Sequence, residues 1–260
     1  MNNLSIKYTN DKIETTVKYG INNVPYISID RLEKTGIVIN GFSTRLGGVS
    51  TDHLSSMNLG YKRGDNPDNV TKNHKLIADA IGFDYKRLVT SDQTHTTNVL
   101  VVTSKDCGKG ITIPRDYSDI DGLITNESNV PLVTYFADCV PLYFVDPVKK
   151  VIGLSHSGWR GTVGKIGKKT IETMTAHFGS NPADMIVCIG PSICCKCYEV
   201  DLDVAKEFMN AFPDSYEQML KEKQDGKYQL DLWKANEQVF LEAGVKTDNI
   251  VVTGICTCDN

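Results

Sequence analysis

Two apolar runs joined by a charged turn decide the fold, and they occupy the stretch Val140-Pro141-Leu142-Tyr143-Phe144-Val145-Asp146-Pro147-Val148-Lys149-Lys150-Val151-Ile152-Gly153-Leu154-Ser155-His156. Short runs with so few polar residues are typical of central strands that are covered on both faces. The turn at 146–150 reverses the chain between them. We therefore predict a pair of adjacent strands that brings Cys139, before the first strand, and His156, after the second, to one edge of a sheet.

The rest of the chain alternates short apolar or β-branched runs with helical patterns. Asn66-Pro67-Asp68 predicts the start of a helix, because proline fits the first turn, and Gly82 predicts its end. Further strands are expected at 37–43, 98–103, 131–137, 185–189 and 250–253, and further helices at 163–178, 201–211 and 232–242. The pattern predicts an α/β (α+β mixed) fold, a layered sandwich of mixed β-sheets flanked by helices, built as a single domain over 1–260.

The composition is that of an ordinary globular protein, with 260 residues, 40% hydrophobic residues and a formal net charge of -4. This balance argues against a dedicated nucleic-acid binder, which usually has a basic face. No apolar run is long enough to span a bilayer, and the polar segment 1–10 lacks the apolar centre of a signal peptide. We therefore expect a cytoplasmic protein that binds neither nucleic acid nor membrane.

Three separate stretches each offer one side chain that zinc accepts as a ligand: His95, Cys139 and His156. Two neutral imidazoles and a thiolate can hold zinc with its fourth position open, which distinguishes a catalytic zinc site from a structural one. Taken singly, each has a simpler interpretation, since a lone histidine is usually a hydrogen-bonded structural residue and a lone cysteine usually belongs to the core. If the three converge, the sequence predicts a metalloenzyme with these residues at its catalytic centre.

Three charged residues complete the candidate site. Asp138 precedes the candidate thiolate ligand, cannot be buried comfortably without a partner, and is a candidate catalytic acid or base. Arg160 lies in the Gly-Trp-Arg-Gly turn at 158–161, and Arg45 precedes the Gly-Gly pair at 47–48, whose amides can face an anion. Both arginines are candidates for binding phosphate or carboxylate.

The chain contains eight cysteines. Without a secretion signal, we expect free thiols or ligands rather than disulfides. Two clusters, at 194–197 and 256–258, contain five of the eight. For these clusters buried or loop thiols are the preferred interpretation, and a structural metal site is the alternative.

Several motifs, taken together and in this order, resemble the YfiH-like family, long labelled multicopper polyphenol oxidases or laccase-like proteins. The resemblance runs from Phe42 to Cys258, which is most of the chain. The motifs are Ser43-Thr44-Arg45-Leu46-Gly47-Gly48-Val49-Ser50, Met57-Asn58-Leu59-Gly60, Gln93-Thr94-His95, Asp121-Gly122-Leu123-Ile124-Thr125, Ala137-Asp138-Cys139-Val140-Pro141, His156-Ser157-Gly158-Trp159-Arg160-Gly161, Gly190-Pro191-Ser192-Ile193, Cys197-Tyr198-Glu199-Val200 and Asp231-Leu232-Trp233.

The resemblance implies a fold, a metal site and a reaction. The family's zinc ligands fall on His95, Cys139 and His156, and its fold is a layered α/β sandwich related to cysteine hydrolases. The family implies a purine nucleoside phosphorylase that also cleaves methylthioadenosine and deaminates adenosine. The expected partners are then a purine nucleoside and phosphate, with Arg45 and Arg160 as the phosphate-binding candidates, and a second copy of the chain in a homodimer.

The chain departs from the family pattern at Thr94 and Thr96, where valine and glycine are usual, and at Ser157, where alanine is usual. Family members usually continue after Asp259-Asn260 into a Phe-Ser-x-Arg-Arg segment. If that segment supplies anion-binding arginines, we expect lower activity from a chain that lacks it.

Three other functions stay open at this point. The family label suggests a copper oxidase, and a blue-copper centre also uses two histidines and one cysteine. A multicopper cluster is disfavoured, because only His53, His74 and His177 remain beyond the two ligand histidines. Cys139 as nucleophile with His156 as base would make an amide hydrolase of the peptidoglycan-editing kind. The third alternative is a binding protein with a vestigial metal site.

Overall fold

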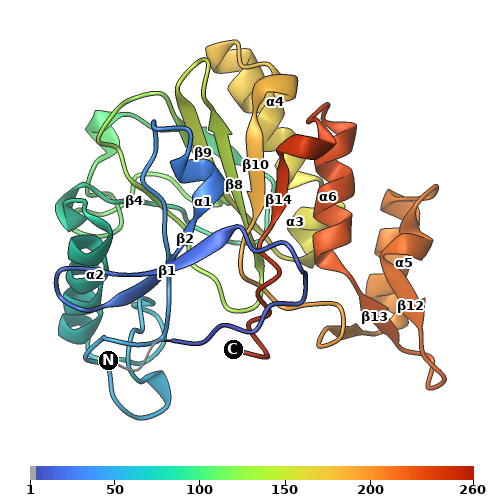
Figure 1. Cartoon of the computed structure of the whole chain (residues 1–260), viewed down its shortest axis with the longest axis horizontal. Helices are drawn as coiled ribbons and strands as arrows, with labels where there is room; N and C mark the ends of the chain where they lie inside the picture. Colours follow the sequence, from blue (N-terminus) through green and yellow to red (C-terminus); the bar gives the residue numbers. More distant parts are fainter. Residues whose placement is uncertain (1–3) are drawn as a thin grey trace.

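A six-stranded mixed β-sheet lies at the centre of the structure, a computed structural model that describes residues 4–260 (Figure 1). The first three residues of the polar segment 1–10 lie outside the described range. The central β8 and β9 are antiparallel, with Pro141 opposite His156, which confirms the predicted strand pair. The strand order is β14 (Ile250–Val252), β10 (Ile186–Ile189), β8 (Val140–Asp146), β9 (Val151–Ser157), β6 (Gly122–Thr125) and β5 (Val99–Val101).

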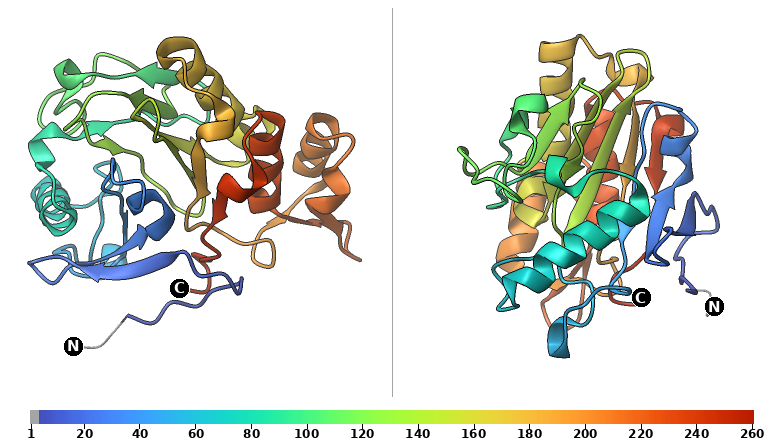
Figure 2. Two further views of the ribbon diagram at one scale, coloured as in Figure 1. Left: turned by 45° about the horizontal axis from the view of Figure 1, so that its top comes forward. Right: turned by 90° about the vertical axis from the view of Figure 1, so that its left-hand side faces the viewer.

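Helices cover one face of this sheet (Figure 2). They are α3 (Trp159–Val163), α4 (Ile166–Phe178) and α6 (Leu232–Glu242). The main hydrophobic core lies between them and the strands, where Phe144 of β8 meets Phe240 of α6 edge to face with 5.6 Å between ring centroids. Beside this layer stand α5 (Leu202–Ala211) and a small sheet of β11 (Glu199–Val200), β13 (Tyr228–Leu230) and β12 (Leu220–Glu222).

The other face of the central sheet carries a second layer. This layer consists of β1 (Thr15–Tyr19), β2 (Pro25–Ile29), β3 (Phe42–Ser43) and α1 (Asp30–Glu33), with α2 (Pro67–Ile81) beside it. Ile29 and Leu32 form a buried cluster with Tyr143 and Val145 of β8. Because both of its faces are covered, β8 is buried along its whole length, and its sequence shows no apolar–polar alternation.

The sequence located most elements but not all of their bounds. The helix at 67–81 is confirmed as α2, whose first turn is capped by the Asn66 side chain and which ends at Gly82 with φ 105°. Only β3 forms from the expected strand 37–43, since the Asn40 amide bonds both backbone groups of Ile29, at 2.8 and 3.1 Å, in place of a strand partner.

Two further expected elements are shorter, and one expected turn is a helix. From the expected strand 131–137 only β7 (Leu132–Val133) forms, and it pairs in parallel with β4 (Val89–Thr90). The expected helix 163–178 forms as α4 and begins only at Ile166, because Lys165 before it adopts a left-handed φ of 58°. The Gly-Trp-Arg-Gly segment 158–161 was expected to be a turn, but it begins helix α3 at Trp159. Within residues 4–260, none of the helices is both long and apolar enough to cross a membrane.

Candidate functional site

The structure brings His95, Cys139 and His156 together at one end of the central sheet. One ligand atom from each residue lies within 4.8 Å of the other two. Cys139 immediately precedes β8 and His156 is the penultimate residue of β9, so antiparallel pairing places both at the same edge. His95 arrives from the loop between β4 and β5 with a left-handed φ of 65°. The convergence that a three-ligand metal site requires is therefore present.

A buried carboxylate, Asp121, bonds the ring of His156 and the backbone of the loop that carries His95. Its Oδ1 accepts a hydrogen bond from Nδ1 of His156 at 2.8 Å, so His156 is left with Nε2 for a metal, as is usual for metal-binding histidines. The same carboxylate accepts hydrogen bonds from the backbone amides of Thr94, His95 and Thr96 at 3.1, 3.2 and 2.8 Å. Asp121 therefore also shapes the loop that carries His95.

The protonation of this group follows from these contacts. Burial works against the imidazolium of His156, but hydrogen bonds to Asp121 and Cys139 outweigh it and raise the pKa of His156 to about 9. Burial and the nearby His156 charge lower the pKa of His95. Burial favours the neutral acid at Asp121, but the hydrogen bonds it accepts outweigh this and lower its pKa. A metal at His156 must therefore displace a proton, so metal affinity rises with pH up to about 9.

Gly158 makes room for the three side chains. A Cβ atom at this position would lie 2.7 Å from Nδ1 of His95 and 3.1 Å from Sγ of Cys139. The backbone itself, with φ -72° and ψ 179°, is one that any residue adopts. The glycine is therefore required for its missing side chain and not for its conformation.

Replacement Gly158→Ala is expected to displace His95 or Cys139 and to lower metal affinity by about 10-fold or more, since site geometry must hold to within about half an ångström. Gly161→Ala is the matched control, because a Cβ there meets its nearest atom at 3.4 Å, an ordinary contact. Zinc titration of both variants provides the measurement. Equal affinities in the two variants would show that the close approach at Gly158 has no functional consequence.

The three side chains line a cavity of about 1060 Å³. Its walls come from β3, α2, β7 and the loops around them. Phe136 forms an apolar surface beside the histidines, with ring centroids 5.7 Å from His156 and 6.2 Å from Phe42. A cavity with an aromatic wall and a convergent polar corner is typical of a small-molecule site.

The other predicted site residues lie at different places around this cavity. Arg45 is exposed and lines it. Arg160 is exposed outside the lining, where its guanidinium stacks 4.2 Å from the ring centroid of Trp159. Asp138 is exposed, does not line the cavity, and accepts a hydrogen bond from the hydroxyl of Thr257 at 2.6 Å. The structure thus brings Arg45 to the cavity wall and leaves Asp138 and Arg160 outside its lining.

Sequence reasoning assigned no role to Asp121 or Phe136. Asp121 offered a signal, because an acidic residue directly before the buried strand β6 must find hydrogen-bond partners. Phe136 offered none, since it belongs to an apolar run that was expected to be a strand. Arg63 is also exposed on the cavity wall and was not considered.

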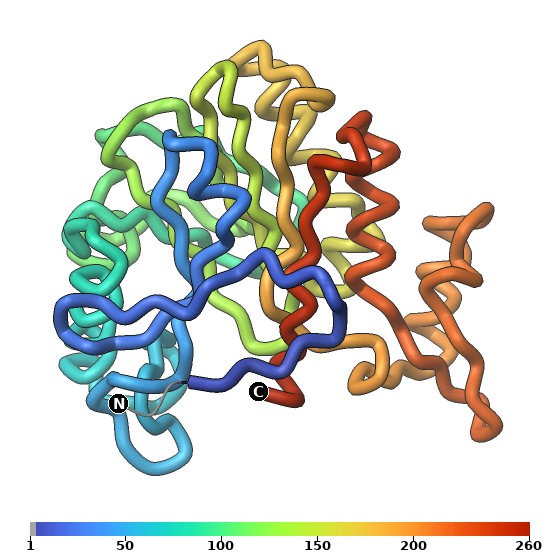
Figure 3. Tube along the Cα trace, viewed as in Figure 1, coloured from blue at the N-terminus to red at the C-terminus, as the bar shows by residue number. Residues whose placement is uncertain are grey.

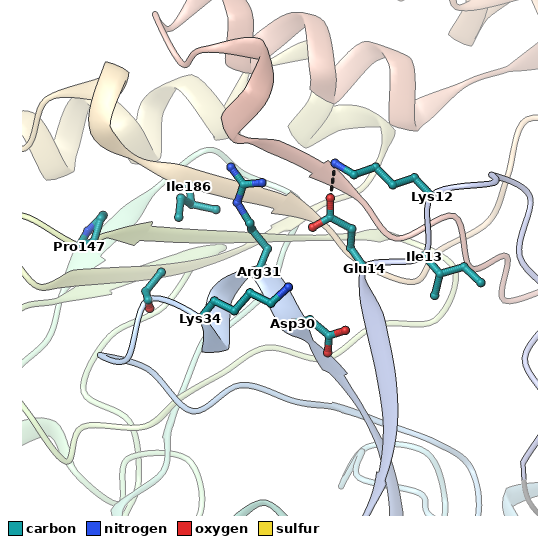
Figure 4. Close-up of a pocket in the computed structure, with 9 residues that line it drawn as sticks. Lys12, Ile13, Glu14, Asp30, Arg31, Lys34, Pro147 and Ile186 are labelled. Carbon is teal, nitrogen blue, oxygen red and sulfur yellow. Dashed lines mark ion pairs between the residues drawn. The ribbon is translucent and has the colours of Figure 1, made fainter.

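A second cavity, of about 600 Å³, offers less chemistry (Figure 4). Glu14 and Lys12 on its wall form an ion pair with each other, and Arg31 donates a hydrogen bond to the backbone oxygen of Asp248 at 3.0 Å. Its lining contains neither histidine nor cysteine. The cavity with the His-Cys-His group is therefore the candidate functional site.

The remaining histidines lie elsewhere. His74 is buried in α2, where its ring nitrogens bond the backbone oxygen of Val70 and the hydroxyl of Tyr135. His53 and His177 are exposed. Among residues 4–260, the two groups of side chains that could hold a metal include none of these three. The residues needed for a multicopper cluster are not gathered in the described part of the chain.

Comparison with known proteins shows the same family along most of the chain. The family model described as "Multi-copper polyphenol oxidoreductase laccase" matches residues 39–260. A protein named "Purine nucleoside phosphorylase YlmD", from Bacillus subtilis (strain 168), is 42% identical over 224 residues, which cover 85% of this chain and 79% of that protein.

Solved structures agree. A structure titled "Crystal structure of Bacillus licheniformis hypothetical protein YfiH" matches with a TM-score of 0.85 and 34% identity, over 90% of this chain and 88% of that one. YlmD from Geobacillus stearothermophilus matches with a TM-score of 0.84 and 31% identity, over 98% and 91% of the two chains. The predicted mixed α/β fold is thereby confirmed. The chain belongs to the YfiH-like family, whose model carries the laccase description.

Proposed function

We propose that the chain is a zinc-dependent purine nucleoside phosphorylase that acts on adenosine, inosine and methylthioadenosine, with a further adenosine deaminase activity. The observation that carries the proposal is the meeting of His95, Cys139 and His156 around Asp121 on the wall of a cavity. The substrate class is supported by relatives named purine nucleoside phosphorylase.

The donor set suits zinc. Two imidazoles and one thiolate bind zinc with an open position, and Asp121 leaves Nε2 of His156 free for a metal. When bound, zinc would supply Lewis-acid polarisation of the substrate. Copper would bind the same donors, but a multicopper oxidase needs further histidines, and His53, His74 and His177 lie outside the group. The proposal therefore favours zinc.

Phosphorolysis makes simple demands on the protein. A phosphate oxygen bonds to C1′ of the ribose while the glycosidic C–N bond breaks. The electron pair of the broken C–N bond leaves with the purine. Arg45 and Arg160 would hold the phosphate through bidentate hydrogen bonds, and stacking on Trp159 would orient the guanidinium of Arg160. The purine would lie against Phe136, and the cavity wall would limit competition from water.

Deamination of adenosine would use the same cavity with water in place of phosphate. Asp138 is the candidate acid or base for this reaction. To reach a substrate its carboxylate would have to leave the hydroxyl of Thr257, which it contacts at 2.6 Å. Inosine formation that persists in an Asp138→Asn variant would remove Asp138 from that role.

Product analysis of the zinc-loaded protein with inosine, adenosine and methylthioadenosine, each with and without phosphate, tests the function. We expect free base and the corresponding sugar phosphate only when phosphate is present, and inosine from adenosine in its absence. Base release that does not depend on phosphate would replace phosphorolysis by hydrolysis. Complete lack of turnover would favour a binding protein.

Replacement Arg160→Lys is expected to raise the KM for phosphate by about 10-fold to 100-fold, because a lysine cannot reproduce a charge-assisted bidentate pair of about 1.5–3 kcal/mol. Zinc content and the KM for the nucleoside should change little. Arg87→Lys is the matched control, since Arg87 bonds the backbone oxygen of Asn129 and does not line the cavity. An unchanged phosphate KM would make Arg160 a structural residue of α3.

A further inference from the structure

Cysteines from two segments far apart in the sequence meet at a second place in the fold. Cys194 and Cys197 lie in the loop after β10, and Cys256 lies beyond β14. One ligand atom from each of these residues and from Asp259 lies within 4.8 Å of the others. Figure 3 shows the two segments running side by side near the end of the trace, where Ser192 and Cys256 form a parallel bridge.

The local backbone explains why the first two thiols share one side of their loop. Cys194 and Cys197 are separated by two residues, the spacing usual in zinc-binding turns. The amides of Cys197 and Tyr198 both donate to the backbone oxygen of Cys194, at 3.0 and 3.1 Å, and close a tight turn. The two cysteine clusters are far apart in the sequence, so only the fold reveals that they meet.

The distances fit a metal better than a disulfide. Sγ of Cys256 lies 3.8 Å from Sγ of Cys197, whereas bonded sulfurs are about 2.05 Å apart. Ligands about 2.3 Å from a tetrahedral zinc lie roughly 3.8 Å from each other. The backbone amide of Cys194 also donates to Sγ of Cys256 at 3.3 Å, a contact that stabilises a thiolate.

Thiols that only fill the core would be surrounded by apolar side chains and would not gather around an exposed carboxylate. Cys256 and Cys194 are buried, with 0% and 4% of their surface exposed, but the group also contains the exposed carboxylate of Asp259. Two buried thiols, one half-buried thiol and an exposed carboxylate together supply four ligands, the number that closes a structural zinc site.

We propose that Cys194, Cys197 and Cys256 bind a structural zinc ion, with the carboxylate of Asp259 as the fourth ligand. This ion joins the segment after β14 to the loop after β10. The same two segments hold Asp138: Thr257 donates to its Oδ1 at 2.6 Å and Ile193 donates to its backbone oxygen at 3.0 Å. The ion thereby also steadies the residue that precedes Cys139. The proposal does not depend on the reaction catalysed.

Zinc counting separates this site from the His-Cys-His group. The full chain, made with zinc in excess, is expected to hold two zinc ions, and the His95→Ala/His156→Ala variant is expected to keep one. With cobalt(II) in place of zinc, that variant should show sulfur-to-cobalt charge-transfer bands about three times as intense as a single thiolate gives, since three cysteines bind the metal. A metal-free double variant would overturn the proposal, as would a native disulfide among the three cysteines detected by intact mass.

A second variant keeps the test valid if the histidine variant does not fold. Cys256→Ser in the otherwise native chain is expected to lose one of two zinc ions and to unfold at a lower temperature. Cys107→Ser is the matched control, because Cys107 lies outside the group and its thiol donates a hydrogen bond to the backbone oxygen of Asn129, at 3.9 Å. Equal zinc content in the two serine variants would contradict a site at Cys256.

Discussion

Removal of the zinc ion bound by His95, Cys139 and His156 is expected to lower turnover of the nucleoside by about 10³-fold. Lewis-acid stabilisation is worth several kcal/mol, and each 1.36 kcal/mol corresponds to about tenfold in rate. Activity should return when zinc is added back after dialysis against a chelator. Measurement of initial rates at matched protein concentration, with circular dichroism to show that the fold persists, provides the test.

Cys139 distinguishes metal chemistry from thiol chemistry in the same experiment. As a zinc ligand its thiolate is protected, whereas a nucleophilic thiol beside His156 would react with iodoacetamide. We expect alkylation of Cys139 only after chelation, with peptide mapping to separate it from Cys194, Cys197 and Cys256. A metal-free protein that is fully active and is inactivated by alkylation of Cys139 alone would instead indicate a cysteine hydrolase.

Cys139→Asp provides an independent comparison. A carboxylate is also a zinc ligand, so this variant is expected to retain weak zinc binding and some activity. A thiol mechanism would lose all activity in the same variant, because a carboxylate at this position cannot replace the thiolate nucleophile. Zinc titration and rate measurement on one preparation decide between the two.

Replacement Asp121→Asn is expected to weaken zinc binding by about 10-fold to 100-fold, the usual effect of removing the carboxylate behind a metal-binding histidine. Asparagine keeps one acceptor oxygen but presents an NH₂ group to the amides of Thr94 and Thr96, which now donate to Oδ2. The free energy of unfolding of the metal-free protein should fall by about 1–3 kcal/mol, because buried donors lose their acceptor.

This loss of stability should depend on pH. The folded-state pKa of Asp121 is lowered from the ordinary value of 3.8, so its contribution is present above that pH and is lost as the pH falls through the folded-state pKa. Asp119→Asn is the matched control, since its carboxylate accepts only the exposed hydroxyl of Thr94 at 2.8 Å. If the two variants match in zinc affinity and in stability at neutral pH, Asp121 does not organise the site.

Local pattern was sufficient to predict the elements with strong periodicity or strong end signals. The apolar runs of β8 and β9 predicted buried strands, and the short turn between them predicted their antiparallel pairing. Asn66 and Gly82 predicted the ends of α2, because each end depends on a single residue. The side chain of Asn66 caps the first turn, and Gly82 readily adopts the left-handed conformation that ends the helix. The strand expected at 37–43 was mostly wrong, because a strand forms only where a neighbouring backbone pairs with it. Here the side-chain amide of Asn40 bonds the backbone N–H and C=O of Ile29, the groups that a paired strand would have used.

The sequence by itself determined the chemistry available at the site and placed Cys139 and His156 at one edge, since a short hairpin leaves little choice of register. Only the tertiary structure decided that His95 joins them, because its loop is held by the carboxylate of Asp121, which lies 26 residues away along the chain. The same holds for the thiols of Cys197 and Cys256, which meet across 59 residues. Contacts between distant segments depend on how sheets and loops pack, and no local pattern of residues encodes that packing.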